Sequence, residues 1–176
     1  MKAMIIVNNG LEECEALITY DLLFRAGIKT DLVGLQKEIL SSHELSFKAH
    51  ELIDEIDPAG YDCLILPGGM PGTLNLENDA RVQKLIDDFV KEGKLVAAIC
   101  AAPSILIHKG LLRDDHFICF PGFESGLVPA KDVKAIKDGN FITGKGLGAA
   151  FEFAALIIKE LLGEEKAEEV LQKIQY

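Results

Sequence analysis

The sequence predicts an α/β protein in which a mostly parallel sheet is covered by helices on both faces. Short, almost wholly apolar runs alternate along the chain with longer stretches of helical periodicity. Strands that are apolar throughout are typical of a sheet buried on both faces, and their alternation with helices indicates parallel crossovers. No repeat or linker divides the 176 residues, so we expect one domain, residues 1–176.

The first half of the chain predicts three strands of this sheet and two of the helices that cover it. Apolar residues at helical spacing predict a helix over 12–26, which Gly27 ends. Residues 36–57 show no clear period and predict short strands and irregular chain. The other predicted elements are strands over 3–8, 30–35 and 61–66 and an amphipathic helix over 79–91.

The second half continues the alternation and adds a hairpin. Asp138-Gly139-Asn140 is typical of a hairpin turn between two strands. The long apolar helix and the polar helix at the end complete the pattern. The predicted elements are strands over 95–99, 116–120, 133–136 and 141–143 and helices over 101–109, 148–162 and 164–174.

Composition excludes several classes of function. No apolar run reaches the roughly 18 residues of a membrane span, and a net charge of −10 argues against nucleic acid as a partner. The four cysteines show neither a disulfide framework nor metal-ligand spacing. We therefore expect no metal and no cofactor. The N-terminal MKAMIIVNNG lacks an export signal, and we expect a cytoplasmic protein.

Three strand-end loops are predicted to meet at one edge of the sheet. They are Asn8-Asn9-Gly10, Pro67-Gly68-Gly69 and Cys100-Ala101-Ala102. In open α/β sheets ligands bind at the carboxyl ends of the strands. These loops are therefore the candidate site.

Cys100 is the candidate nucleophile of this site. In LVAAICAAPSIL it stands where a buried strand ends and a predicted helix begins, among alanines small enough for a sharp turn. Such a nucleophile elbow exposes its side chain, and free N–H groups at a helix start favour a thiolate. The alternative is a structural, buried thiol.

Gly68, Gly69 and Glu15 could assist the cysteine. The two glycines could direct backbone N–H groups at an anion, although they also fit a plain turn. Acidic residues in a first helical turn are ordinarily surface residues, but Glu15 could share a proton with the thiol.

The histidines and one glycine-rich loop are weaker candidates. No histidine follows Cys100 directly, and His108, two helical turns later, is expected to face away. Gly144, Gly146 and Gly148 precede a helix at neither dinucleotide-loop nor Walker spacing. We interpret them as close backbone packing, with anion binding as the alternative.

Several motifs together resemble the ThiJ/PfpI superfamily, in the branch of the Parkinson disease protein and its bacterial relatives. They are EECEALITYDLLFRAGIKTDLVGL, YDCLILPGG, AAICAAP and GLGAAFEFA. The resemblance implies a flavodoxin-like three-layer sandwich, a homodimer and a reactive cysteine at a nucleophile elbow. In that branch the cysteine oxidises readily to sulfinic acid.

The resemblance also assigns residues. Cys100 resembles the reactive cysteine and Glu15 the glutamate at its sulfur, while Gly69 and Ala101 resemble the backbone donors around it. Arg25 and, by a looser match, His43 resemble residues at the dimer interface and the pocket edge.

One position departs from the family pattern. Better-known members carry a histidine where this chain has Phe120, before Pro121. Without that histidine a Cys-His relay has no base, which disfavours efficient hydrolysis, and Glu15 would have to act as the base. Cys119 is a pocket residue and a candidate resolving thiol, although strand alternation allows only one of Cys119 and Phe120 to point inward.

The expected function is a cysteine-based stress response. Cys100 would react with peroxides or electrophiles, and could support glyoxalase- or deglycase-type turnover of small α-oxoaldehydes or their adducts. Two alternatives remain open: a cysteine hydrolase of the protease or amidase type, and a non-enzymatic, redox-regulated chaperone or partner-binding protein.

Overall fold

The computed structural model describes residues 1–176 and contains a seven-stranded sheet. The strand order is β5-β2-β1-β6-β7-β9-β8, and every pairing is parallel except that of β8 with β9. The predicted mostly parallel sheet is confirmed. Its strands are β1 (Lys2–Val7), β2 (Lys29–Gly34), β5 (Glu51–Leu52), β6 (Cys63–Leu66), β7 (Leu95–Ile99), β8 (Ala135–Asp138) and β9 (Phe141–Gly144).

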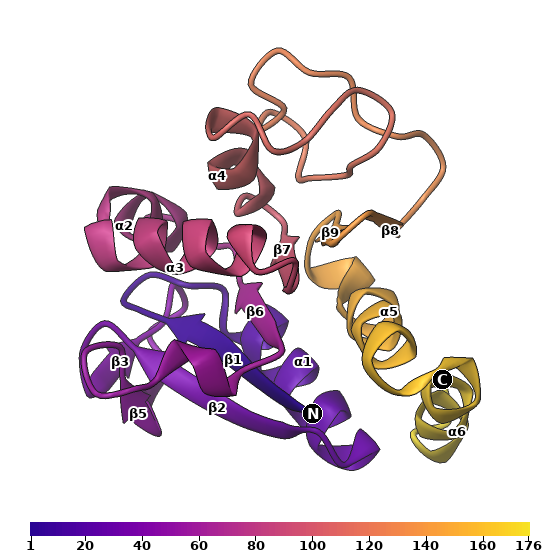
Figure 1. Cartoon of the computed structure of the whole chain (residues 1–176), viewed down its shortest axis with the longest axis horizontal. Helices are drawn as coiled ribbons and strands as arrows, with labels where there is room; N and C mark the ends of the chain where they lie inside the picture. Colours follow the sequence, from indigo (N-terminus) through magenta and orange to yellow (C-terminus); the bar gives the residue numbers. More distant parts are fainter.

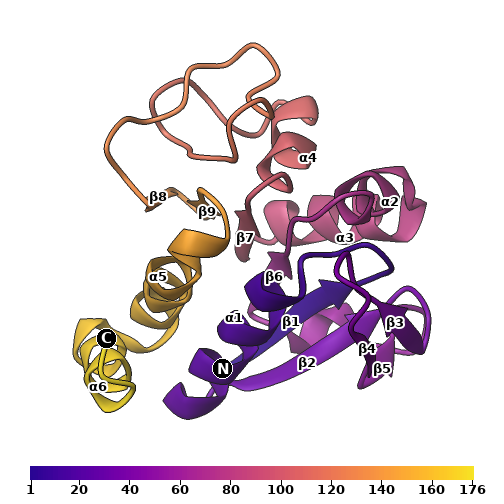
Figure 2. The same ribbon diagram turned by 180° about the vertical axis from the view of Figure 1, so that it is seen from behind.

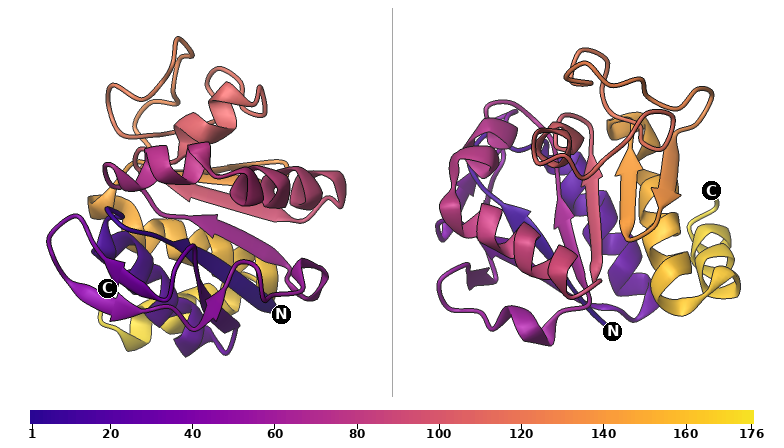
Figure 3. Two further views of the ribbon diagram at one scale, coloured as in Figure 1. Left: turned by 90° about the vertical axis from the view of Figure 1, so that its left-hand side faces the viewer. Right: turned by 45° about the horizontal axis from the view of Figure 1, so that its top comes forward.

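The helices form one layer on each face of the sheet (Figure 1). Figure 3 shows the sheet between these layers, with the gold helices on one side and the magenta helices on the other. One layer contains α1 (Glu13–Ala26), α5 (Ala150–Leu162) and α6 (Glu164–Lys173). The other contains α2 (Gly72–Asn78), α3 (Ala80–Lys91) and α4 (Pro103–His108).

Side chains alternate along the buried strands and so divide the core in two. In β1, Ile5 and Val7 pack against the layer of α1 and α5, whereas Met4 and Ile6 pack against the layer of α3. Both faces of the central strands are covered, which is why these strands are apolar throughout. The predicted three-layer sandwich is therefore confirmed.

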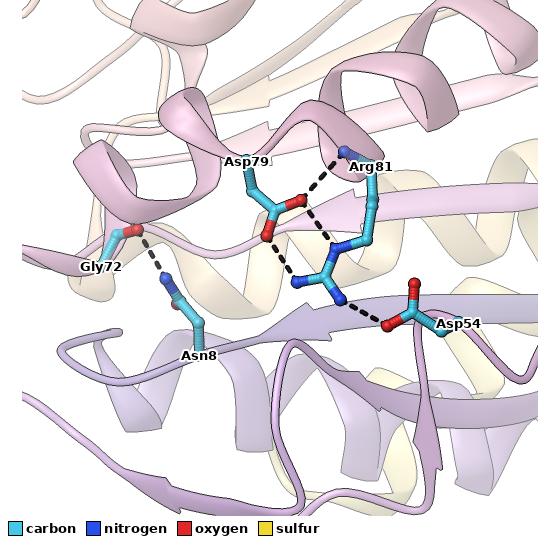
Figure 4. A network of polar contacts seen from close by, with 5 residues as sticks. All are labelled: Asn8, Asp54, Gly72, Asp79 and Arg81. Carbon is cyan, nitrogen blue, oxygen red and sulfur yellow. Dashed lines mark hydrogen bonds and ion pairs between the residues drawn. The ribbon is translucent and has the colours of Figure 1, made fainter.

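Capping residues fix the helix ends near their predicted positions. Gly27 ends α1 with a left-handed φ of 83° and donates its N–H to Leu23 O and Phe24 O. Asp79 caps α3 by accepting a hydrogen bond from the Arg81 N–H, and Arg81 extends to Asp54 (Figure 4). This ion pair ties the start of α3 to the chain after β5.

Residues 36–57 contain short strands, as expected, and two of them form a separate hairpin that was not predicted. It pairs β3 (Glu38–Leu40) with β4 (Ser46–Lys48) in an antiparallel two-stranded sheet. A 3₁₀ turn, η1 (Pro58–Gly60), then leads to β6. None of the helices has both the length and the apolar character that crossing a membrane requires.

The strand predicted over 116–120 is wrong. The edge of β9 is already occupied by β8, so the segment cannot pair with β9. Its N–H groups bond elsewhere: Ile118 donates to Thr143 Oγ1 and Phe120 donates to Cys100 O. The segment belongs to the long connection after α4, which projects beyond the sheet (Figure 2).

Helix α2 was not predicted, because its seven residues begin with a glycine and are too few to show a helical period. It matters for the site because its N-terminal residue, Gly72, packs against the loop after β1.

Candidate functional site

The loops after β1 and β6 are joined by backbone hydrogen bonds at the carboxyl edge of the sheet. Glu12 N–H donates to Gly68 O (2.9 Å), and Gly72 N–H donates to Gly10 O (3.0 Å). The buried Asn8 adds a side-chain bond from Nδ2 to Gly72 O at 2.8 Å (Figure 4). The third loop, after β7, follows the strand beside β6.

Cys100 occupies a sharp turn directly after β7. Its φ is 65°, a left-handed conformation that non-glycine residues rarely adopt and that often marks functional sites. Two hydrogen bonds hold it: its N–H donates to Gly144 O (2.9 Å), and its carbonyl accepts from Phe120 N–H (2.8 Å). The helix predicted from Ala101 begins instead at Pro103, so Cys100 precedes α4 and does not lie in its first turn.

Glu15 brings a buried carboxyl to this turn from the first turns of α1. The residue is only 1% exposed. Its Oε2 accepts a hydrogen bond from Gly68 N–H at 2.9 Å, whereas Oε1 is buried without a hydrogen-bond partner. The side chain of Cys100 interacts with the same carboxyl.

Gly68 has no room for a side chain. A Cβ there would lie 2.6 Å from the Cys100 Cβ and 2.9 Å from Glu15 Oε2. The glycine therefore permits the carboxyl and the cysteine to approach each other. Gly69 has a φ of +90°, and a Cβ on it would lie 2.2 Å from Glu12 N.

Burial and mutual repulsion make Glu15 and Cys100 a coupled pair. Burial raises the pKa of Glu15 to about 7, partly offset by the Gly68 N–H and the Cys100 thiol. Burial, and then the negative charge of Glu15, raises the pKa of Cys100 to about 12, although the N–H groups of Ala101 and Gly69 favour the thiolate. Between these two values the pair holds one proton and one negative charge.

The backbone N–H groups expected beside Cys100 favour its thiolate, whereas burial and Glu15 oppose it. The thiol is half-buried and stands beside a carboxylate, and both features oppose its ionisation. A thiolate is favoured when the proton of the pair lies on Glu15.

Phe120 and Cys119 point in opposite directions. The Phe120 ring is 48% exposed, and its Cδ2 lies 3.4 Å from where a Cβ on Gly146 would be. The Cys100 Sγ lies 3.8 Å from the same point, so ring and sulfur share the space on one side of Gly146. Cys119 is only 2% exposed, packs with Ile107 and Phe117, and has its pKa raised to about 12 by burial and then by Glu124.

His43 contacts the start of α1. Its Nδ1 lies 3.1 Å from Glu13 Oε1 and 3.5 Å from Glu12 Oε2. The hydrogen bond with Glu13 and the charge of Glu12 raise the pKa of this exposed histidine. The side-chain hydrogen bonds of His43 go to Ser42 and Glu13 and not to Cys100 or Glu15.

The ligand atoms of Glu12, Glu13 and His43 lie within 4.8 Å of one another, a grouping that the sequence did not reveal. The three side chains lie together because His43 forms ion pairs with both Glu12 and Glu13. Arg25, on the exposed side of α1, pairs with Asp21 at 2.6 Å.

The other candidates lie away from the pair. His108 bonds Glu77 Oε1 (2.5 Å) and Ser125 Oγ (2.7 Å), so it faces away from Cys100 as expected. Cys63 is fully buried in β6, and Cys14 is exposed on α1.

Gly146 is the site residue whose role the sequence did not predict. Its only signal was the spacing of three glycines before a helix. That spacing cannot show that a loop after β9 returns to a cysteine after β7.

Residues 1–160 match the DJ-1/PfpI family. The chain belongs to this family. Protein dj-1beta of Drosophila melanogaster is 34% identical over 96% of this chain and 93% of its own length. The Parkinson disease protein 7 homolog of Danio rerio is 33% identical over 96% and 94%.

Other members of the DJ-1/PfpI family share the fold closely. The crystal structure of Drosophila melanogaster DJ-1beta superposes with a TM-score of 0.93 at 33% identity, covering 99% of this chain and 97% of that one. Oxidized Toxoplasma gondii DJ-1 also gives 0.93, at 29% identity, with 99% and 98% covered. A Caenorhabditis elegans relative named glutathione-independent glyoxalase DJR-1.2 is 29% identical over 93% of this chain and 89% of its own.

Proposed function

We propose that this chain is a cysteine-based stress-response protein whose Cys100 reacts with peroxides and electrophiles and turns over small α-oxoaldehydes or their adducts. One observation carries the proposal: a strained, half-buried cysteine lies beside a buried glutamate at the carboxyl edge of the sheet, and both pack against Gly68. The name of the Caenorhabditis elegans glyoxalase and the oxidized state of the Toxoplasma gondii structure support it.

The proposed turnover uses the pair twice. The Cys100 thiolate adds to the aldehyde carbon, and the new alkoxide takes the proton held by Glu15, which gives a hemithioacetal. The Glu15 carboxylate then removes the hydrogen of that carbon and returns it to the neighbouring carbon through an enediol, while the hydroxyl proton of the first carbon passes to the oxygen of the second.

The proton transfer leaves a thioester of the 2-hydroxy acid on Cys100, which water hydrolyses to release the acid and the thiol. The aldehyde carbon is oxidised while the neighbouring carbonyl is reduced, so the sum is oxoaldehyde plus water to hydroxy acid. The backbone N–H groups of Gly69 and Ala101, which already favour negative charge on the sulfur, would stabilise the charged intermediates.

Consumption of methylglyoxal tests this function. We expect Cys100→Ser and Glu15→Gln to lose at least 100-fold in kcat/KM, in line with the contribution of general acid–base catalysis. Cys14→Ser, which alters an exposed thiol on the same helix as Glu15, serves as the control and should keep full activity. Unchanged consumption in Cys100→Ser would contradict the enzymatic part of the proposal.

Peroxide titration tests the sensing part separately. Mass spectrometry should locate oxidation at Cys100 before the buried Cys63 and Cys119. Equal oxidation of all thiols would contradict a dedicated sensor.

The two alternatives have less support. Hydrolysis of amides needs a base for the cysteine, and no histidine hydrogen-bonds Cys100. A chaperone would suppress the aggregation of a client protein equally well in Cys100→Ser, which the enzymatic proposal does not predict.

We further propose that the protein is a cytoplasmic homodimer. Support comes from α1, where Phe24 is 68% exposed next to Arg25 and would be covered by a second copy of the chain. Sedimentation equilibrium of the wild type and of Phe24→Glu tests this assembly.

A further inference from the structure

A cavity of about 520 Å³ adjoins the reactive pair. Phe120 and Gly146 line this cavity, and a Cβ on Gly146 would lie 3.4 Å from Phe120 Cδ2 and 3.8 Å from Cys100 Sγ. A compound bound to Cys100 would therefore extend into this space. The lining residues are Phe120, Pro121, Lys134, Lys145, Gly146, Leu147, Gly148 and Ala149.

The only charged residues that line this cavity are two lysines. Lys134 is neutralised, since its Nζ lies 2.5 Å from Glu152 Oε1. Lys145 is exposed and forms no ion pair, although the protein carries a net charge of −10. An acidic chain thus leaves one unpaired ammonium group at a cavity whose walls, at Phe120 and Gly146, lie beside the cysteine.

Two carboxylates stand nearby, in the adjoining cavity that shares Pro121, Lys134 and Lys145. They belong to Glu124, whose Oε2 accepts a hydrogen bond from Gly122 N–H, and to Asp132. Neither lies within ion-pair distance of Lys145, so its charge stays available to a ligand.

The backbone also favours an anion in this cavity. Gly146 leads into η2 (Leu147–Ala149) and then into α5, a helix of 13 residues, so its positive dipole end borders the cavity beside Lys145. The cavity therefore suits a small ligand with one negatively charged group and an otherwise apolar body. The ammonium group and the helix start would attract the charge, and the apolar wall would contact the rest.

We propose that this cavity selects the substrate of Cys100 by charge, and that the preferred α-oxoaldehydes carry a carboxylate at the end remote from the aldehyde. The substrate part rests on the proposed function. The preference for negatively charged compounds at the sulfur does not depend on that function, because it applies to any compound that reacts with Cys100.

Alkylation with two matched reagents separates the two parts. Iodoacetate and iodoacetamide differ by one charge, and the ratio of their rates at Cys100, followed by mass spectrometry, reports the local potential. We expect Lys145→Gln to lower this ratio about fivefold, the effect of one nearby unit charge in a solvated site. Lys145→Arg should keep the ratio, and added salt should reduce it in the wild type.

Lys131→Gln is the control, because Lys131 is an exposed lysine that lines only the adjoining cavity. It should leave the ratio within twofold of the wild type. A ratio that does not change in Lys145→Gln, or that falls equally in Lys131→Gln, would overturn the proposal.

Turnover tests the substrate class. We expect 4,5-dioxovalerate to be consumed with a higher kcat/KM than methylglyoxal, and Lys145→Gln to abolish that preference. A preference for methylglyoxal would overturn the substrate class. Failure to consume either compound, together with a fivefold lower alkylation ratio in Lys145→Gln, would refute the enzymatic function and support the charge preference.

Discussion

The carboxyl of Glu15 accepts a 2.9 Å hydrogen bond from the backbone N–H of Gly68, and this bond connects the first helix to the loop after β6. Since Gly68 also lies against the Cβ of Cys100, the bond places the carboxyl beside the thiol. The reactive pair therefore depends on a glycine that takes no part in the chemistry.

Gly68→Ala should destabilise the protein. The new methyl group would lie 2.6 Å from the Cys100 Cβ, so the backbone or the pair must shift, at a cost of about 1–3 kcal/mol. Urea denaturation measures the loss. Gly60→Ala is the matched control, because no atom lies within 4 Å of its added Cβ. Equal stability of the two variants would contradict the close approach.

Glu15→Gln should change how stability depends on pH. The pKa of Glu15 is about 7 in the folded protein and 4.5 ordinarily, so the folded state holds this proton more tightly than the unfolded state. Stability is then lost as the pH rises through this interval, by up to about 3 kcal/mol. Glutamine keeps an acceptor for Gly68 N–H but cannot ionise.

The difference in unfolding free energy, Glu15→Gln minus wild type, should therefore increase between about pH 4.5 and pH 8. Taking the difference removes the contributions of the other titrating groups. Parallel pH profiles for the two proteins would show that Glu15 does not have a raised pKa.

Phe120→His should make Cys100 more reactive near neutral pH. The ring at this position shares the space beside Gly146 with the sulfur, so a protonated imidazole would stabilise the thiolate. We expect alkylation at pH 7 to accelerate about tenfold, which corresponds to one unit in the thiol pKa. Phe120→Leu controls for the loss of the aromatic ring, and equal rates in both variants would show that residue 120 does not influence the sulfur.

Much of the fold and part of the site could be predicted from the sequence. Apolar strands, Gly27 and the residues around Cys100 specify local structure, and they placed β7 at its observed residues, 95–99. The strand over 116–120 could not be excluded locally, since only the pairing of β8 with β9 shows that the edge is occupied.

The electrostatics of the site were harder to predict. The position of Glu15 in a first helical turn is ordinarily a solvated one, and its burial arises from the packing of α1 against the loop after β6. Likewise, Gly146 lies 46 residues after Cys100, and only the adjacency of β7 and β9 brings them together.

The pH dependence of Cys100 alkylation, measured in the wild type and in Glu15→Gln, tests the shared proton most directly. In the wild type the rate should rise with a half-point near 7, because the pair then loses its first proton and a fixed fraction of the charge lies on sulfur. It should level off and rise again only at high pH, towards the second value of about 12. In Glu15→Gln the alkylation rate should show a single rise with no plateau. A single rise near the ordinary thiol pKa of about 8.5 in both proteins would contradict the shared proton.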